Sequence, residues 1–484
     1  MDLNDFVASL DTKHGIFVDG RGYGTSATFE VHDPATRKVI AEVADATPTD
    51  ATSAVDAAAA AFPVWAATAP RARSDVLRKA YDLMLADTET LATLISWENG
   101  KSLTDARAEV TYAAEFFRWF SEEAVRTDGV YGGSPAGGTR TIVTHKPVGV
   151  AALVTPWNFP AAMATRKIAP ALAAGCTVVL KPASETPLTA LALARVITDA
   201  GAPNGVVNVV PTLDAPAVVT TWLDDDRVRK VSFTGSTAVG RTLLKKAAER
   251  VLNASMELGG NAPFIVTADA DLNAAVAGAM TAKFRNAGQA CTAANRFYVH
   301  ASVVREFNAM FGAAIESLKV GPASDPEMQV GPLISAKAVA GVHAMLDAAI
   351  ADGARVAHQA LAPTGGWYFP PTLLTDVRAG NPILLEEIFG PIAPVVTWTD
   401  EAEMLQQVNA TEYGLAAYVF AGRLQDALHI SESIDAGMVG INRGVISDPS
   451  TPFGGVKQSG LGREGARAGI REFQETQYFS ADFA

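Results

Sequence analysis

Short apolar runs alternate with helical segments through the middle of the chain, and this alternation constrains the fold more than any other feature. Apolar runs rich in β-branched residues occur at 149–155, 177–181, 206–210, 229–233 and 252–257. The stretches between them place apolar residues at three-to-four spacing, which is typical of amphipathic helices. Strands joined through helices form parallel sheets, because a parallel connection needs a crossover. The pattern therefore predicts an α/β fold with a doubly wound open sheet.

The flanking sequence predicts further elements. Residues 50–126 read as helices that cover the sheet. After Gly259-Gly260 the alternation begins again, so we predict a second α/β unit with helices at 271–286 and from 303 and strands at 297–299, 393–398 and 437–441. The segment 471–480 alternates charged with apolar or aromatic residues. It is typical of an edge strand that pairs with another subunit, and a frayed tail is the alternative.

Composition excludes several classes of partner. The net charge of -13 would repel a phosphate backbone, so no nucleic acid is expected. Residues 147–165 carry no charge, but three prolines and Asn158 interrupt them, which favours a buried strand and loop over a membrane span. The first residues lack the basic start and apolar core of a secretion signal, so we expect a cytoplasmic protein. Charged residues make up only 19%, which favours subunit contacts over part of the surface.

Cysteine and histidine usage argues against disulfides and metals. Cys176 and Cys291 are the only cysteines, too few for a disulfide scaffold in a chain of 484 residues. The seven histidines contain no His-x-x-x-His pair, and no Cys-x-x-Cys occurs. We therefore expect no metal site.

Three side chains could carry chemistry. Cys291 lies among small residues that let other groups approach its sulfur, and a buried inert thiol is the alternative. Glu257 ends an apolar strand, where open sheets place their ligand crevice, and could be a general base or a salt-bridge partner. Asn158 follows another strand between two prolines, which would hold its amide rigidly for a developing oxyanion; a turn-forming asparagine is the alternative.

Two strand ends carry groups suited to a nucleotide. The Gly-rich turn 233–240 follows a strand and opens a helix, as a phosphate-binding turn should, although its Gly-x-x-x-x-Gly spacing is not the usual dinucleotide fingerprint. Lys181 and Ser184 follow the strand 177–181 and suit a ribose or its phosphate. A solvated lysine is the alternative.

Together these residues resemble the aldehyde dehydrogenase superfamily, over nearly the whole chain and in the family's order. The matching motifs lie at 156–160, 233–236, 256–260, 288–291, 387–391 and 452–455. The resemblance implies that Cys291 attacks an aldehyde, that Asn158 stabilises the oxyanion with the Cys291 backbone N–H, and that Glu257 activates the water that hydrolyses the resulting thioester. The cofactor-binding residues it implies are Thr155, Pro156, Trp157, Lys181, Ser184, Gly235, Ser236, Leu258, Glu387 and Phe389.

Within the superfamily the chain is most similar to the succinate-semialdehyde dehydrogenases, through residues 164–167, 283–289 and 454–465. That resemblance implies that Arg166, Arg285 and Ser447 hold the distal carboxylate of the substrate. Two guanidinium groups suit a carboxylate, and surface salt bridging is their alternative role. Glutarate semialdehyde or a general aliphatic aldehyde remains an alternative substrate. A cofactor-free thiol esterase and a silent binding protein are rivals from other classes.

The resemblance also implies the cofactor and the domains. NAD-preferring members often carry a glutamate three residues after the strand-end lysine, where this chain has Ser184, so we expect NADP to be accepted and preferred over NAD. A turn of Glu185 toward the ribose would restore a preference for NAD. Ala293 stands where some members have a second cysteine, so no disulfide switch is expected.

We predict a Rossmann-like cofactor domain (1–126 and 149–257, with 448–466), a catalytic domain (258–447) and a β oligomerisation element (127–148 and 467–484). The expected assembly is a homodimer or homotetramer.

Overall fold

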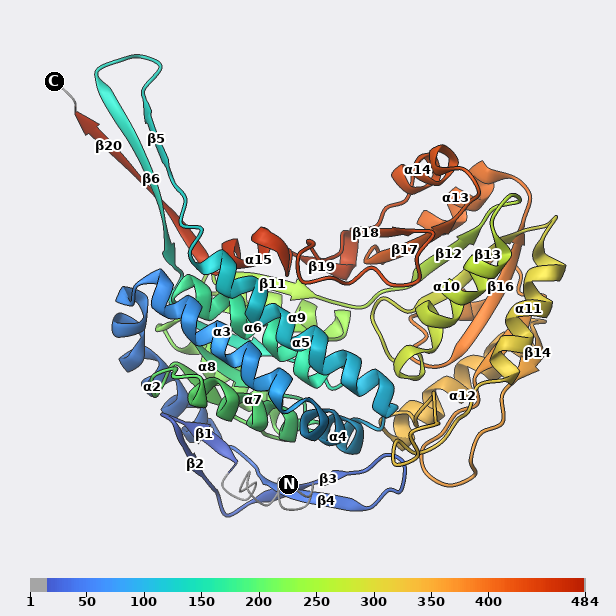
Figure 1. Cartoon of the computed structure of the whole chain (residues 1–484), viewed down its shortest axis with the longest axis horizontal. Coiled ribbons are helices and arrows are strands. Elements are labelled where there is room, and N and C mark those ends of the chain that lie inside the picture. The colour runs from blue at the N-terminus through green and yellow to red at the C-terminus, as the bar shows by residue number, and fades with distance from the viewer. Residues whose placement is uncertain (1–14, 483–484) are drawn as a thin grey trace.

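The computed structural model describes residues 15–482, so the N-terminal residues inspected for a secretion signal lie outside it. Figure 1 shows two units of sheet and helix side by side, with a narrow β arm projecting from the first. No helix in the described part of the chain is long and apolar enough to cross a bilayer.

The first sheet contains the five predicted parallel strands. They are β7 (Val150–Val154), β8 (Thr177–Lys181), β9 (Val207–Val209), β10 (Val228–Thr234) and β11 (Asn253–Glu257), in the spatial order β11-β10-β7-β8-β9. Three short antiparallel strands, which the sequence did not indicate, extend its edges: β1 (Ile16–Val18), β2 (Arg21–Tyr23) and β19 (Gly460–Leu461). Strands of two or three residues are too short to show a period of two.

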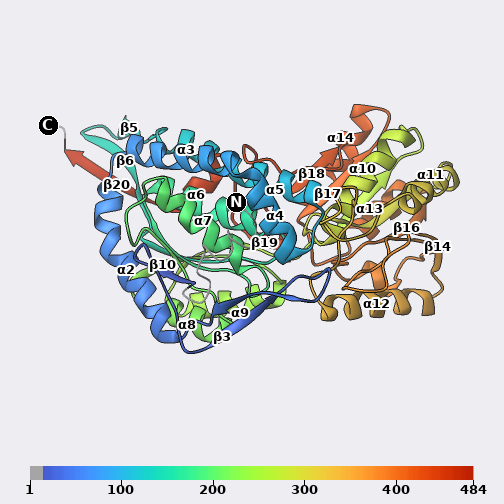
Figure 2. The same cartoon turned by 60° about the horizontal axis from the view of Figure 1, so that its bottom comes forward.

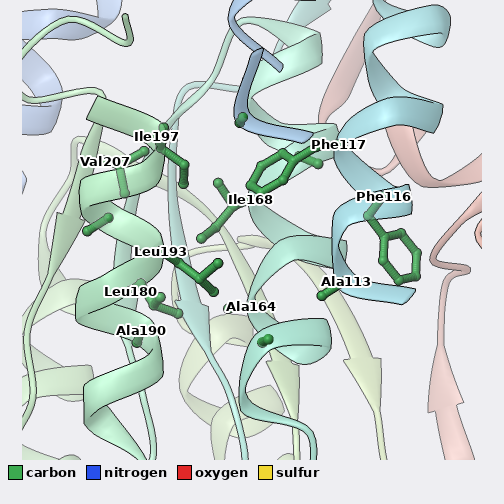
Figure 3. Close-up of a cluster of buried hydrophobic side chains, with 14 of the residues drawn as sticks. Ala113, Phe116, Phe117, Ala164, Ile168, Leu180, Ala190, Leu193, Ile197 and Val207 are labelled. Carbon is green, nitrogen blue, oxygen red and sulfur yellow. The ribbon is translucent and has the colours of Figure 1, made fainter. Parts of the chain in front are cut away.

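Helices cover both faces of this sheet (Figure 2). Helices α6 (Pro160–Ala174) and α7 (Pro187–Asp199) pack on one face, while α2 (Pro48–Ala67), α8 (Ala215–Asp224) and α9 (Thr237–Ala248) pack on the other. The helical prediction for 50–126 is confirmed by α2, α3 (Pro70–Ala86), α4 (Thr88–Asn99) and α5 (Leu103–Ala124). Helix α3 packs against α6 and α7, and α5 packs against α6, so α6 and α7 lie between these two helices and the sheet. Figure 3 shows Phe117, Ile168 and Leu193 buried between these layers.

The second sheet confirms the predicted second α/β unit. Its strands, in spatial order, are β14 (Arg355–Gln359), β15 (Thr372–Thr375), β16 (Ile392–Trp398), β13 (Ala294–His300), β12 (Ala262–Val266), β17 (Ala416–Phe420) and β18 (Met438–Ile441). All neighbours are parallel except β14 with β15. The helices of this half are α10 (Leu272–Phe284), α11 (Val304–Glu316), α12 (Ala336–Ala351), α13 (Glu401–Asn409) and α14 (Leu424–Glu432).

The arm joins two segments that are far apart in the sequence. Strands β5 (Val130–Gly133) and β6 (Thr139–Pro147) form a hairpin, and β20 (Gln474–Asp482) follows α15 (Ala466–Arg471) and pairs antiparallel with β6 over nine residues. The segment 471–480 is therefore mostly a strand that pairs within its own chain. Its pairing with another subunit stays a prediction, as does the division into domains. A separate ribbon, β3 (Thr28–His32) with β4 (Val39–Ala44), completes the fold.

Candidate active site

A cavity of about 220 Å³ opens at the carboxyl ends of the first sheet's strands. The carboxyl edge of an open parallel sheet is where ligands bind, because the loops that follow the strands converge there. None of the described residues that line it is a histidine, the residue that a Cys–His hydrolase pairs with its cysteine. The residues lining it are Pro156, Trp157, Asn158, Met163, Thr234, Gly235, Ser236, Leu258, Gly259, Cys291, Glu387 and Phe389.

The Cys291 loop is held in an unusual backbone conformation. Helix α10 ends at Phe284, and a short 3₁₀ turn, Arg285–Gly288, leads toward the cysteine. Asn286, Ala287 and Gly288 have φ angles of 50°, 54° and 76°, a region that side-chain-bearing residues rarely occupy. The backbone N–H of Asn286 donates to Asp105 Oδ2 at 2.8 Å, which ties this turn to helix α5. Tertiary contacts therefore stabilise a turn that local sequence does not favour.

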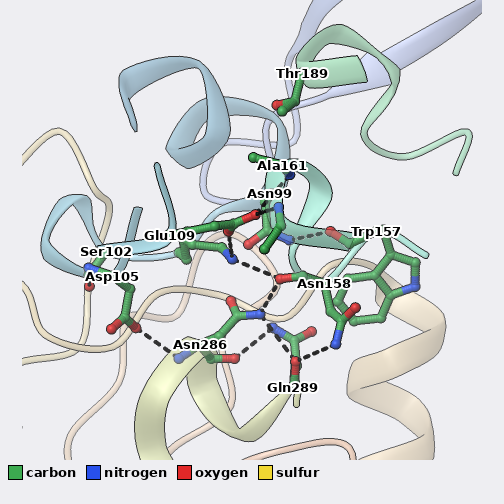
Figure 4. A network of polar contacts seen from close by, with 12 residues as sticks. Asn99, Ser102, Asp105, Glu109, Trp157, Asn158, Ala161, Thr189, Asn286 and Gln289 are labelled. Carbon is green, nitrogen blue, oxygen red and sulfur yellow. Dashed lines mark hydrogen bonds and ion pairs between the residues drawn. The ribbon is translucent and has the colours of Figure 1, made fainter. Parts of the chain in front are cut away.

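Asn158 is bound to the same loop (Figure 4). Its side-chain Nδ2 donates to the carbonyl of Gln289 at 3.2 Å, and its own carbonyl accepts from Asn286 Nδ2 at 2.8 Å and from Lys101 Nζ at 2.7 Å. An amide nitrogen carries two hydrogens, so one remains for an oxygen atom near the sulfur. The sequence predicted that two prolines would hold this amide rigidly; in the structure the amide also bonds to Gln289 in the Cys291 loop, while Asn286 and Lys101 bind the backbone carbonyl of the same residue.

Lys101 belongs to a buried ion pair that the sequence did not reveal. Its ammonium contacts the Glu109 carboxylate, and both side chains are fully buried. The same carboxylate accepts from the backbone N–H groups of Ala161 (2.9 Å) and Ala162 (3.3 Å) at the start of α6, which has no cap of its own. Glu109 thus caps the helix that follows Asn158, because a carboxylate satisfies free N–H groups at a helix start.

Glu257 ends β11 in a nearly dry environment. The side chain is 3% exposed, and its Oε2 has no hydrogen-bond partner among the described residues. A Cβ at Gly454 would lie 2.8 Å from Glu257 Oε1, so only glycine leaves this carboxylate its space. Burial raises the pKa of Glu257 well above its usual range, the Glu464 carboxylate raises it further, and Arg166 opposes the rise. A buried carboxylate with a raised pKa is suited to accept a proton during a reaction.

The Cys291 thiol is partly exposed at the cavity. Burial raises its pKa to about 12, the carboxylates of Glu387 and Glu257 add to this, and the guanidinium groups of Arg166 and Arg285 oppose it. The thiol is therefore protonated near neutral pH. Because only a thiolate is strongly nucleophilic, the site needs a group that takes this proton.

The two arginines differ in their surroundings. Arg166, on α6, is 2% exposed, with its guanidinium 4.0 Å from the Phe453 ring centre and its Nε 2.9 Å from Glu464 Oε2. Arg285 is partly exposed over the ring of Phe159, and it has no ion-pair partner within residues 15–482. The alternative of ordinary surface salt bridging therefore fits neither arginine. Ser447 is partly exposed and lowers the pKa of Tyr112, whose hydroxyl accepts a hydrogen bond from Arg166.

The cavity and the neighbouring strand ends fit a dinucleotide. A Cβ at Gly235 would lie 2.5 Å from the Phe233 ring, so a side chain there would disturb the entry to α9, whose N-terminus is suited to a phosphate. Phe389 and Trp157 contact edge to face, with ring centres 5.4 Å apart, and form an aromatic wall. Glu387 accepts from the backbone N–H of Gly260 at 3.0 Å, which fixes this carboxylate at the cavity.

The predicted ribose-binding residues lie outside the lining of the cavity. Lys181 ends β8, where its backbone carbonyl accepts from the N–H of Thr155 at 3.2 Å. Burial lowers the pKa of Lys181, and Glu185 opposes this. Ser184 donates to Glu185 Oε2 at 3.2 Å. The hydroxyl of Ser184, which we expected to bind a ribose or its phosphate, is thus hydrogen-bonded to Glu185, the carboxylate whose turn toward the ribose would favour NAD.

The described residues contain no cluster of three or more potential metal-binding side chains. Residues that the sequence did not single out also border the site, namely Lys101, Asp105, Glu109, Tyr112, Met163 and Glu464. These come from distant segments, and only Glu464 lies in a stretch that carried the resemblance, 454–465.

Comparisons with known proteins agree with this arrangement. Residues 23–479 match the aldehyde dehydrogenase family. A succinate-semialdehyde dehydrogenase of Paenarthrobacter nicotinovorans is 53% identical over 91% of this chain and 98% of its own length. A glutarate-semialdehyde dehydrogenase of Pseudomonas aeruginosa is 46% identical over 93% of both chains. The crystal structure of an NADP-dependent enzyme of E. coli superimposes with a TM-score of 0.96 at 44% identity, covering 98% of this chain and 99% of that one.

Proposed function

The chain belongs to the aldehyde dehydrogenase family, and from this premise we propose that it oxidises succinate semialdehyde to succinate. The observation that carries the proposal is the pair of guanidinium groups, Arg166 and Arg285, which both act electrostatically on the Cys291 thiol. A bidentate guanidinium is the side chain best matched to a carboxylate. An aldehyde with a carboxylate at its far end could place its carbonyl group at Cys291 and its carboxylate at these guanidinium groups.

The proposed catalytic roles use the arrangement around Cys291. Cys291, after losing its proton, would attack the aldehyde carbon, and the free N–H of Asn158 and the Cys291 backbone N–H would stabilise the oxygen that becomes negative. A nicotinamide cofactor, when bound, would supply the hydride acceptor. The remaining thioester is hydrolysed by a water whose proton passes to Glu257. The product is then a free carboxylic acid.

Several residues would hold the cofactor. Gly235, Ser236 and the start of α9 suit the pyrophosphate, and Pro156, Leu258 and Phe389 line the same cavity. Glu387 is fixed at that cavity and suits the nicotinamide ribose, while Lys181 suits the adenosine ribose. The roles of Thr155 and Trp157 are part of the same proposal.

A panel of aldehydes tests the substrate. We expect kcat/KM for succinate semialdehyde to exceed that for butanal by at least about 100-fold, because two charged hydrogen-bonding groups contribute about 1.5 to 3 kcal/mol each. Glutarate semialdehyde, longer by one CH₂, is the second candidate, since a relative named for it is 46% identical. NAD(P)H formation measured with all three aldehydes and both cofactors decides between them. Equal activity on butanal would contradict the proposal.

Replacement of Ser184 by glutamate should shift cofactor choice. We propose that NADP is preferred, because a hydroxyl and an ammonium at the end of β8 can both bind a 2′-phosphate, and because the superimposed E. coli enzyme is named as NADP-dependent. In Ser184→Glu, the new carboxylate should lower the ratio of kcat/KM values for NADP over NAD by at least about tenfold, through charge repulsion. The aldehyde's KM should change little. A wild-type enzyme that strongly favours NAD would refute the phosphate site.

Glu185→Gln is the matched control for this prediction. Glu185 accepts from the Ser184 hydroxyl and is exposed, so loss of its charge should leave NADP binding unchanged or stronger. Weaker binding of NAD in this variant would mean that Glu185 faces the ribose.

Assembly into homodimers or homotetramers is also a proposal. In the described arm, β20 lies at the edge of a three-stranded sheet, so its outer edge is available to another strand. Exposed Tyr131, Tyr478 and Phe479 add apolar surface to this arm. The assignment of the arm to oligomerisation depends on this exposed edge. The assignment of the first sheet to the cofactor and of the second sheet to catalysis belongs to the same proposal.

A further inference from the structure

Tyr112 connects two of the residues proposed to bind the substrate carboxylate. It lies on α5 with its side chain partly exposed, and its hydroxyl oxygen is 3.3 Å from Arg166 Nη2. The Ser447 hydroxyl lies near it and lowers the pKa of the Tyr112 phenol. Its ring meets Phe116 edge to face, with centres 5.1 Å apart. The hydroxyl is therefore held at one place, between a cation and a second hydroxyl.

We propose that Tyr112 is a specificity-determining positioning residue that presents Arg166 and Ser447 to the distal carboxylate of the substrate. This inference rests on the proposed function, because it concerns the part of the substrate that distinguishes succinate semialdehyde from an uncharged aldehyde.

The donor inventory supports this role. A guanidinium only donates, so the Tyr112 oxygen accepts from Arg166. The bond from Arg166 does not use the proton of the Tyr112 hydroxyl. This proton remains for an acceptor, and a carboxylate only accepts. Burial raises the pKa of Tyr112 above its ordinary value, with Arg166 opposing, so the phenol keeps this proton at neutral pH.

Tyr112 also contacts a different nitrogen of the guanidinium from Glu464. The Glu464 carboxylate contacts Arg166 Nε at 2.9 Å and is shared with Lys167. Tyr112 contacts Nη2, and the rings of Phe453 and Phe116 lie 4.0 and 5.2 Å from the guanidinium carbon. Without the hydroxyl, Nη2 loses a neutral acceptor that fixes its direction. The arginine would then bind a carboxylate less precisely, while its charge and packing remain.

Tyr112→Phe tests the inference, since it keeps the ring and removes the hydroxyl. We expect KM for succinate semialdehyde to rise at least about tenfold, with kcat within about twofold of wild type, because a hydrogen bond to a charged group is lost before chemistry begins. The kinetics with butanal should stay within about twofold. Tyr298→Phe is the matched control: Tyr298 is buried in the second sheet and also lies beside an arginine, with the Arg296 guanidinium carbon 6.0 Å from its ring centre, so loss of its hydroxyl should not alter the preference between aldehydes.

A double-mutant cycle with Ser447→Ala adds a second measurement. If the two hydroxyls act as one unit, the loss in kcat/KM of the double variant should be smaller than the product of the two single losses. Multiplicative losses would overturn the inference.

The remaining outcomes separate this inference from the function on which it rests. If the wild-type enzyme prefers succinate semialdehyde and Tyr112→Phe keeps that preference, or loses activity equally on both aldehydes, the inference fails and the proposed function stands. A wild-type enzyme without this preference overturns both.

Discussion

Cys291→Ser should lose dehydrogenase activity by at least about 10³-fold, because a hydroxyl at this position is a far weaker nucleophile than a thiolate. The measurement is NAD(P)H formation with succinate semialdehyde under saturating cofactor. Cys176→Ser is the matched control. Cys176 is fully buried, with its sulfur 3.3 Å from the carbonyl of Phe473, and should be dispensable for the reaction. Equal losses in the two variants would contradict the assignment.

Glu257→Gln belongs to the same prediction and separates the two chemical steps. The amide cannot accept a proton, so thioester hydrolysis should slow by about 10²- to 10⁴-fold, while acylation and one hydride transfer still occur. Rapid-mixing measurements should therefore show a burst of about one NAD(P)H per site, followed by slow turnover. Because the pKa of Cys291 is raised, some group must take the proton of the thiol before it attacks. A slower burst would indicate that Glu257 is this group. Steady-state turnover at the wild-type rate would end the assignment.

Arg285→Ala should impair succinate semialdehyde by about 10- to 150-fold in kcat/KM and leave butanal nearly unchanged. The physical reason is that this guanidinium has no ion-pair partner within the described residues, so its charge is available to a substrate. Parallel kinetics with the two aldehydes measure the effect. Arg78→Ala serves as the control, because Arg78 is an exposed arginine whose contacts are a surface ion pair with Asp82 and the ring of Tyr81.

Arg285 is a sharper test of substrate binding than Arg166. Removal of Arg166 would leave the buried carboxylates of Glu464 and Glu257 with one cation fewer beside them. This would lower the free energy of unfolding as well as the affinity for the substrate. Equal loss of activity on both aldehydes in Arg285→Ala would mean that this residue supports the Cys291 loop and does not bind the carboxylate.

The five parallel strands could be predicted because each is a continuous apolar run followed by a helix, so periodicity alone identifies them. The same pattern placed Asn158, Lys181, Gly235 and Glu257 after strand ends, and the carboxyl ends of parallel strands meet at one edge. The sequence therefore determined that these four residues lie at the same edge of the first sheet. Short edge strands such as β1 and β19 could not be predicted, because they depend on a sheet that already exists.

Only the tertiary structure decided what surrounds those groups. Lys101 and Glu109 hold Asn158 and the start of α6, although no recognisable motif joins them to these partners. The contact between Glu109 and Ala161 spans 52 positions of the chain, and the contact between Lys101 and Asn158 spans 57. Tyr112 and Glu464 contact the same arginine from segments near opposite ends of the chain. Local sequence determines periodicity and strand ends, because these depend on neighbouring residues. Hydrogen-bond partners and burial, which set the pKa values of Glu257 and Cys291, depend on which distant segments fold against them.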